Sequence, residues 1–334
     1  MSKAAELAAL IGSGQAQGDK NLIINGNFDV WQRGTSFSDA NDVYTADRFN
    51  VVSGGGTTGD TVSQQSFTAG QTDVPNEPTY FLRYAMGGTS SNKVMHHRIE
   101  DVRTGAGKTC TLTFYAKAST GHTSTVEVAQ VFGSGGSSQV TQSAQNYTMT
   151  TSWQKFTFTI ALPSISGKTI GTSSYVYIAF IRSLSSSNVS IDIAQMQFEV
   201  GDVATPFEHE SFAATLEKCQ RYFYRIGGNE TDALGSNVGR IASGVMFGPT
   251  NAQIIRPNFV TMRDAPNVTF DDAVANYTVM TSKTTNAVTS IVSNQSTAST
   301  MSVSMTCGAT SNDGDGAVLR STRAQSTVSV DSEL

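Results

Sequence analysis

Apolar and polar residues alternate at period two along most of the chain after residue 20. This alternation predicts half-buried β-strands, because successive side chains of a strand point to opposite faces of its sheet. Segments rich in Gly, Ser and Thr, such as 133–138 and 183–188, separate the runs. The chain is therefore expected to be all-β, built as an antiparallel sandwich or jelly roll. The expected strands are 108–118, 126–132, 153–163, 175–181, 189–200, 240–247, 252–256, 267–270, 287–294, 300–307, 316–324 and 326–334.

A short helix is predicted at the N-terminus. Residues 2–14 are rich in Ala and Leu, and place Leu7, Leu10 and Ile11 on one face before Gly12 ends the helix. Such a short helix is not stable alone in water. It is expected to be either a frayed end or an anchor that folds on docking to a partner or to copies of itself.

A second helical segment interrupts the β pattern at 211–225. Phe212, Leu216, Cys219 and Phe223 recur there at helical spacing. This seam is expected to pack onto a neighbouring β domain, with a three-fold interface between copies as the alternative. The predicted organisation is a helix and linker (1–20), a jelly-roll β-sandwich (21–210), a linking helix (211–225) and a second, C-terminal β-sandwich (226–334).

Composition and charge exclude several classes of protein. Charged residues make up 15% of the chain and the net charge is −5, so the basic footprint of a nucleic-acid-binding protein is missing. No apolar run is long enough to span a bilayer, and residues 1–20 lack the layout of a signal peptide. Three widely spaced cysteines argue against a disulfide framework (Cys110, Cys219 and Cys307). Synthesis in a cytoplasm is expected, without membrane insertion.

Motifs with chemical potential are few, and each has a structural explanation. TGAGKT (104–109) lacks the first glycine of a phosphate loop and precedes a strand, so a turn is expected. His96 and His97 are adjacent in a strand and should point to opposite faces, which excludes joint metal ligation. SNDGDG (311–316) lacks the closing Glu of a calcium loop and is expected to be a hairpin turn. Neighbouring carboxylates occur without further catalytic residues, so no enzyme is expected.

An ordered series of motifs gives the chain a family resemblance. The series is NLIINGNFDVWQRG (21–34), ADRF (46–49), HHRIEDVRTGAGKTCTLTFYAKAS (96–119), TTSWQKFTFTI (150–160), SGKTIG (166–171), IDIAQMQFEVGDVATPFE (191–208) and EKCQRYFYR (217–225). It resembles a family of bacteriophage tail-fibre proteins whose main domain looks like the jelly-roll carbohydrate-binding modules of cellulases and xylanases. The region after residue 225 is similar to that family more loosely, through TMRDAPNVTF (261–270) and SVDSEL (329–334).

The resemblance implies site residues. The carbohydrate-binding modules often hold a structural calcium ion, and the matching acids here are Asp29 and Asp192; no other cofactor is implied. The modules' glycan platform has no matching motif, so the candidate glycan contacts are aromatic residues near loops (Tyr44, Tyr80 and Tyr147). Trp153 is expected in the core. Residues 21–37 are expected to form a first strand and the scaffold beside Asp29, rather than a recognition surface that exposes Trp31 and Arg33.

The resemblance also implies a function. The expected protein is a non-enzymatic virion component, a short tail fibre or fibre-like spike, and a homotrimer. Residues 1–20 would attach it to an adaptor or nozzle protein of the tail or head, and the β domains would bind host surface polysaccharide. Three alternatives remain open: a structural connector or capsid-decorating fibre without receptor binding, a polysaccharide depolymerase or esterase, and a cellular carbohydrate-binding module.

Overall fold

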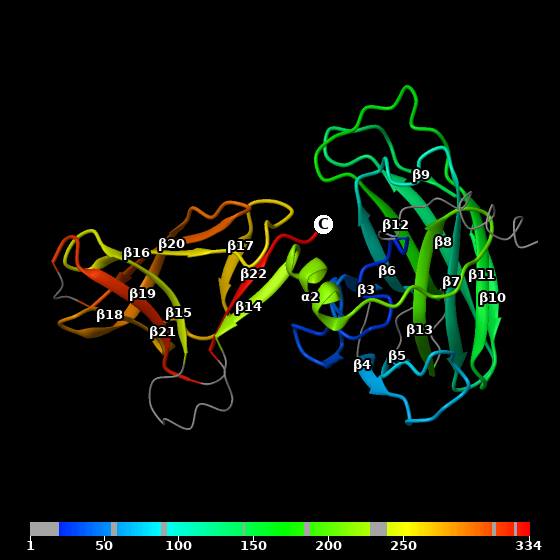
Figure 1. Cartoon of the computed structure of the whole chain (residues 1–334), viewed down its shortest axis with the longest axis horizontal. Helices are drawn as coiled ribbons and strands as arrows, with labels where there is room; N and C mark the ends of the chain where they lie inside the picture. The colour runs from blue at the N-terminus through cyan, green and yellow to red at the C-terminus, as the bar shows by residue number, and fades with distance from the viewer. Residues whose placement is uncertain are drawn as a thin grey trace, which may run out of the picture.

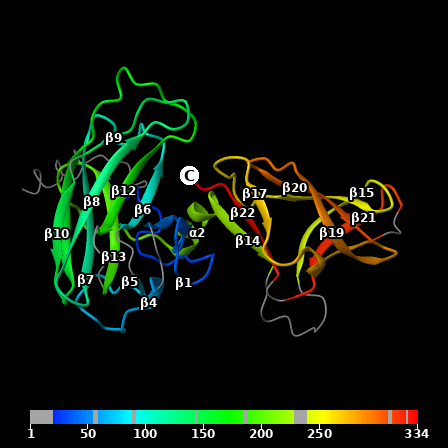
Figure 2. The same cartoon turned by 180° about the vertical axis from the view of Figure 1, so that it is seen from behind.

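The molecule consists of two β domains, which follow one another along its long axis. The structure, a computed structural model, describes residues 20–54, 59–87, 92–142, 144–183, 188–227, 239–308, 312–323 and 326–334. Helix α2 and the C-terminus lie between the two domains (Figures 1 and 2). The predicted N-terminal helix, with Leu7, Leu10 and Ile11, falls outside the described residues. None of the described helices has the length and apolar character needed to cross a membrane.

The N-terminal domain is a sandwich of two antiparallel sheets, which confirms the predicted all-β fold. One sheet has the strand order β1-β4-β5-β13-β7-β11, and the other β10-β8-β12-β6-β3-β2 with β9 beside β8. The strands are β1 Ser36–Ser38, β2 Val43–Tyr44, β3 Phe49–Gly54, β4 Thr61–Ser66, β5 Tyr80–Met86, β6 Asn92–Glu100, β7 Thr109–Ala118, β8 His122–Val131, β9 Val140–Thr141, β10 Gln145–Met149, β11 Gln154–Ala161, β12 Tyr175–Ser183 and β13 Val189–Val200. Consecutive strands mostly alternate between the sheets, as in jelly rolls.

The core lies between the two sheets and follows from the period-two alternation of their strands. In β7, Cys110, Leu112, Phe114 and Ala116 are fully buried and belong to one hydrophobic cluster with residues from both sheets. The alternate side chains of the same strand point to the outer face. The strand pattern therefore fixes which side chains can meet a ligand.

Residues 21–35 correct the prediction of a first strand. They form turns and irregular backbone, and the first strand is β1. Positive φ angles at Asn25 (62°) and Phe28 (57°) break the extended conformation. The segment still belongs to the scaffold: a Cβ at Gly26 would lie 2.1 Å from the carbonyl oxygen of Met196, so only glycine fits against β13.

The linking helix is shorter than predicted. Helix α2 spans Phe212–Gln220 and is followed by strand β14, Phe223–Gly227. Phe212 is 58% exposed, and the buried helical side chains are Thr215 and Cys219. The expected seam of Phe212, Leu216, Cys219 and Phe223 is therefore wrong, because Phe223 already lies in a strand.

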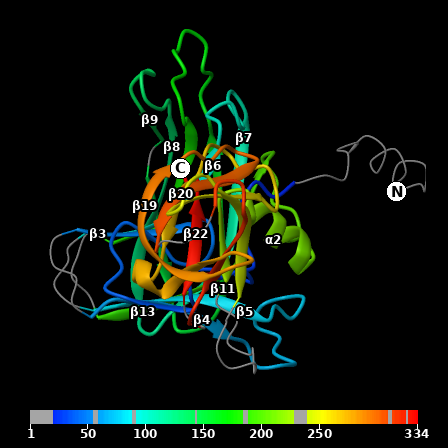
Figure 3. The ribbon, with the colours of Figure 1, turned by 90° about the vertical axis from the view of Figure 1, so that its left-hand side faces the viewer.

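The C-terminal domain corrects the prediction of a second sandwich. Six of its strands form a closed barrel in the order β15-β16-β20-β19-β18-β21, and a three-stranded sheet β14-β22-β17 accompanies it (Figure 1). Figure 3 views the molecule from the side of this domain. Period-two alternation is common to sandwiches and barrels, and here β21 pairs with both β15 and β18 and closes the sheet. The remaining bounds are β15 Arg240–Met246, β16 Asn251–Pro257, β17 Asn267–Phe270, η1 Val274–Asn276, β18 Tyr277–Met280, β19 Thr285–Asn294, β20 Thr300–Cys307, β21 Gly316–Ser321 and β22 Thr327–Asp331.

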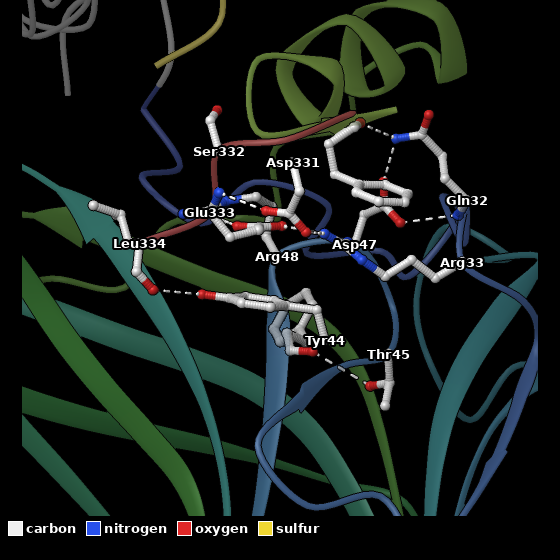
Figure 4. Close-up of polar contacts among 12 residues, drawn as sticks. Gln32, Arg33, Tyr44, Thr45, Asp47, Arg48, Asp331, Ser332, Glu333 and Leu334 are labelled. Carbon is white, nitrogen blue, oxygen red and sulfur yellow. Dashed lines mark hydrogen bonds and ion pairs between the residues drawn. The ribbon is translucent and has the colours of Figure 1, made fainter. Parts of the chain in front are cut away.

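A buried arginine joins the two domains. The guanidinium of Arg48, a residue only 1% exposed, forms an ion pair with the Glu333 carboxylate (Figure 4). It also donates a hydrogen bond to the Arg98 carbonyl oxygen at 2.7 Å. Its guanidinium carbon lies 3.5 Å from the ring centroid of Tyr222. A charge this deeply buried is stable only while its partners are in place.

Residues around Arg48 extend this interface. The Arg33 guanidinium lies 3.4 Å from the ring centroid of Phe223 and 3.1 Å from the carboxylate of Asp331. Gln32 donates a hydrogen bond to the Phe223 carbonyl oxygen at 2.7 Å (Figure 4). The end of β22 and the residues after it thus dock against the segment that the sequence analysis assigned to the scaffold.

Two adjacent buried histidines occupy opposite faces of β6, as predicted. The His97 ring packs on Phe49 in the core, with ring centroids 5.2 Å apart, whereas the His96 ring packs on Tyr177 at 4.7 Å. Burial lowers the pKa of His96 to about 3, and burial also lowers the pKa of His97 well below its usual value. Both side chains are therefore neutral at physiological pH.

Replacement of Arg48 by Met should weaken the whole molecule. The change removes the charge that pairs with Glu333, and breaking a buried ion pair costs about 3–5 kcal/mol. Urea denaturation followed by tryptophan fluorescence measures this loss. Arg103→Met serves as the control, because the Arg103–Asp101 pair is exposed and should contribute less than about 1 kcal/mol. Equal effects of the two substitutions would contradict a structural role for Arg48.

Stability should fall as the pH decreases from 6.5 to 5. In this window the unfolded chain protonates His96 and His97, whereas the native state, with both pKa values lowered, does not. Each histidine contributes a slope of about 1.4 kcal/mol per pH unit in the free energy of unfolding. Urea denaturation at pH 7, 6 and 5 measures the slope, and His96→Phe should reduce it. A variant slope equal to that of the native chain would refute this assignment.

Candidate functional site

The outer face of the sheet β1-β4-β5-β13-β7-β11 carries a row of charged side chains. Asp192 of β13 stands directly opposite Arg83 of β5 on one side and Lys117 of β7 on the other. Arg83 donates two hydrogen bonds to the Asp192 carboxylate, at 2.7 and 2.8 Å, and these bonds raise the pKa of Arg83. The Nζ of Lys117 lies 3.7 Å from the same carboxylate, which is an ion pair beyond hydrogen-bonding distance.

An aromatic cluster lies beside this row. Phe81 of β5 packs with Phe67 and Trp153, at ring-centroid distances of 4.8 and 5.5 Å, and Tyr115 packs against the same small cluster. Trp153 and Tyr115 are only half-buried. The Nζ of Lys117 lies 5.1 Å from the centroid of the Trp153 ring, so charge and aromatic surface are continuous.

Two grooves open on this face, one at each side of the Tyr115–Lys117 stretch. The first has a volume of about 240 Å³ and is lined by Arg83, Lys117, Ala118, Ser119, Thr151, Ser190 and Asp192. The second has a volume of about 330 Å³ and is lined by Pro75, Asn76, Thr113, Tyr115, Lys155, Gln195, Ala204, Thr205, Pro206 and Phe207. Strand β7 contributes to both from Thr113 to Ser119, a track about 20 Å long at roughly 3.3 Å per residue.

A β-bulge shapes the second groove. The pairing of β13 with β7 shifts between Ala194 and Gln197, and Gln195 has a positive φ of 47°. Its side-chain amide donates a hydrogen bond to the Pro75 carbonyl oxygen at 2.7 Å, which fixes the segment that forms one wall. Bulges often redirect side chains at functional sites.

The track combines the groups that protein sites use for sugars. Half-exposed rings of Tyr115 and Trp153 offer flat apolar surface, and burial raises the pKa of Tyr115, so its hydroxyl stays protonated. The amides of Asn76 and Gln195 and the ammonium of Lys155 lie on the same groove.

The two acids expected to share a calcium ion lie apart. Asp192 is committed to Arg83 and Lys117, whereas Asp29 lines a separate small pocket with Asn27 and Glu208. Asp29 accepts a hydrogen bond from Asn27 at 2.9 Å, and burial raises its pKa. An arginine-paired carboxylate does not fit a calcium shell, so the pairing of Asp29 with Asp192 is corrected. Among the described residues, no group of three or more His, Cys, Asp or Glu side chains could hold a metal ion.

The expected glycan contacts also need correction. Tyr147 is 6% exposed and donates a hydrogen bond to the Phe180 carbonyl oxygen at 2.6 Å, so it is a core residue. The hydroxyl of Tyr44 donates to the Leu334 carbonyl oxygen at 3.1 Å, within the interface between the domains (Figure 4). Tyr80 is half-buried at the first position of β5 and lines neither groove.

The sequence analysis did not predict that Arg83, Tyr115, Lys117 and Trp153 form a site, and there is a physical reason. Trp153 was expected in the core but lies in the small cluster on the outer face. In TCTLTFYAKA (109–118), a tyrosine and a lysine occupy the polar positions of an alternating strand. This pattern could have indicated a binding surface on the outer face of the strand. The approach of Arg83 and Trp153 depends on the register between strands, which one sequence does not reveal.

Two other sequence motifs can be assigned. Residues 104–109 form a turn that feeds β7, as predicted, with the Lys108 amide donating to the Gly105 carbonyl oxygen at 3.0 Å. The segment 311–316 was expected to be a hairpin turn, but this is wrong: β20 pairs with β16 and β19, and β21 with β15 and β18. The strands β20 and β21 that precede and follow this segment are therefore not neighbours in the barrel.

Comparisons with known proteins give weak likenesses. No protein-family model and no curated protein matches the chain. Similar solved structures include the enzymatically active domain of tailspike protein 4 of bacteriophage CBA120, with 15% identity over 55% of this chain and 22% of that chain and a TM-score of 0.36. A structure described as "CBM4 structure and function" is 18% identical over 53% of this chain and 98% of that chain, with a TM-score of 0.33.

A third similar structure is a putative sugar binding protein from Bacteroides thetaiotaomicron, 13% identical over 54% of this chain and 100% of that chain, with a TM-score of 0.37. This chain spans about a fifth of the tailspike chain. At these TM-scores the likenesses carry no argument about function. The candidate site therefore rests on its own geometry.

Proposed function

We propose that this protein is a non-enzymatic glycan-binding protein that holds an extended polysaccharide along the outer face of β7. The observation that carries the proposal is the track itself, in which the half-exposed Tyr115 ring lines the second groove and the half-exposed Trp153 ring lies beside Lys117 of the first. Amide, hydroxyl and charged groups line the two grooves. Aromatic rings supply contact area at a low cost in conformational entropy, and the polar groups around them fix orientation.

The motif series supports a place for this glycan binding in a virion. Because the series resembles phage tail-fibre proteins, we assign the chain to a short tail fibre or spike, assembled in the host cytoplasm, whose target is host surface polysaccharide. Residues 1–20 are the proposed attachment to a tail or head adaptor. A connector that never touches the receptor is the alternative for the same series, and it would have no use for the aromatic track.

The chemistry of the grooves supports binding without catalysis. Glycoside hydrolysis uses two carboxyl groups on either side of the scissile bond. Asp192 is the one carboxylate among the described residues that line the grooves, and Arg83 holds both of its oxygens. We propose no cofactor for this function.

Removal of the Tyr115 ring should weaken glycan binding. Tyr115→Ala deletes a central aromatic contact, and the affinity is expected to fall about tenfold. Binding of the full chain to an array of bacterial capsular and O-antigen polysaccharides identifies ligands, and biolayer interferometry measures the affinities. Phe212→Ala is the control, because this ring is 58% exposed, lies on α2 and lines neither groove. Unchanged affinity in Tyr115→Ala, or binding to no polysaccharide of the array, would exclude the proposed site.

The proposed fibre should be a homotrimer. A shallow groove binds weakly, and three copies on one particle raise avidity without new contacts. Size-exclusion chromatography with light scattering on the full chain at micromolar concentration should give three times the 35.4 kDa chain mass. A stable monomer under these conditions would rule the trimer out.

A further inference from the structure

The glycan track is positively charged on a chain that is acidic overall. The net charge of the chain is −5, yet the residues lining the two grooves include three cations, Arg83, Lys117 and Lys155, and one carboxylate, Asp192. The lining therefore carries a net charge of about +2. A local concentration of cations attracts anionic ligands, even on a molecule whose net charge is negative.

The cations are only partly neutralised by their own neighbours. The side chains of Arg83 and Lys117 are 36% and 31% exposed, whereas that of Asp192 is 5% exposed. Arg83 uses Nε and one terminal nitrogen on Asp192. Lys117 approaches Asp192 only to 3.7 Å, so its ammonium can donate hydrogen bonds to a ligand in the groove.

Hydroxyl groups surround these cations. Ser119, Thr151 and Ser190 line the same groove as Arg83 and Lys117. The Trp153 ring lies next to the Lys117 ammonium and can carry the apolar face of the adjoining sugar. The groove thus offers a charge contact and hydroxyl contacts at one end of the aromatic track.

From this arrangement we infer that the glycan bound by the track is acidic, and that Lys117 and Arg83 receive its carboxylate or sulfate group. The inference rests on the proposed glycan-binding function and names the substrate class of the same site. A neutral sugar would offer the Lys117 ammonium hydroxyl acceptors only, whereas a carboxylate or sulfate group would accept a stronger, charge-assisted hydrogen bond from it. Single-stranded nucleic acid also favours aromatic and basic surfaces, but the long runs of positive charge that follow a phosphate backbone are missing from the groove lining.

Matched polymers test the inference. The full chain is assayed by biolayer interferometry against polygalacturonate, alginate and hyaluronan, each beside its carboxyl-reduced neutral derivative, against dextran sulfate beside dextran, and against oligo(dT). We expect an acidic polymer to bind at least tenfold more tightly than its neutral partner, with an affinity that falls as salt increases. The two kinds of acidic polymer distinguish a carboxylate from a sulfate.

A charge-only substitution locates the contact. Lys117→Met removes the ammonium and keeps an unbranched apolar side chain, so binding to the acidic polymer should weaken about fivefold, and by more than binding to its neutral partner. Lys108→Met is the control, because Lys108 is an exposed lysine in the turn before β7, at the other end of that strand. Circular dichroism checks that both variants are folded.

The outcomes separate this inference from the proposed function. Equal binding to an acidic polymer and its neutral partner, or unchanged affinity in Lys117→Met, overturns the acidic substrate class while glycan binding stands. Binding to oligo(dT) in preference to every polysaccharide overturns both. The proposed function also falls, together with this inference, if no polymer of either series binds.

Discussion

The junction between the two domains depends on a buried ion pair, between Arg48 and Glu333. A fully buried guanidinium carries a large desolvation cost, and here a carboxylate, a carbonyl oxygen and the face of Tyr222 offset it together. The partners come from both domains, so the charge is stable only when the domains are joined. The relative position of the two domains is therefore specified by the pairing of a buried charge. A purely hydrophobic interface would specify that position less strictly.

This constraint leaves the sheet that bears the track free. The interface uses the segment 32–48, the end of β6, the start of β14 and the residues after β22. The track lies on β5, β7, β11 and β13, whose outer face carries the charged and aromatic side chains. Binding and domain assembly are thus assigned to separate surfaces, and a change in one need not disturb the other.

The sequence predicted part of the strands, because their information is local, but β3, β4, β5, β10 and β18 were not among those expected. Residues 189–200, 267–270 and 300–307 were bounded correctly, since alternation and turn residues suffice there. Closure of the barrel was not predictable, because it depends on the pairing of β21 with both β15 and β18, and the pattern of a single strand does not specify its partners. The alternation within 109–118 places Tyr115 and Lys117 on the polar side of one strand. The approach of Arg83 and Trp153 to them depends on the register between strands, which one sequence does not reveal. The burial of Arg48 was not predicted, because its partner Glu333 stands 285 positions away.

That sequence separation has a consequence for biosynthesis. Translation at 5–20 residues per second places on the order of 14 to 57 s between the appearance of Arg48 and that of Glu333. During this interval the first domain can fold, but its arginine must remain hydrated and its docking surface open. The nascent chain therefore passes through an intermediate that exposes Arg33, Arg48 and the adjoining turns to any acidic partner. This exposure ends when residues 331–334 are synthesised and dock.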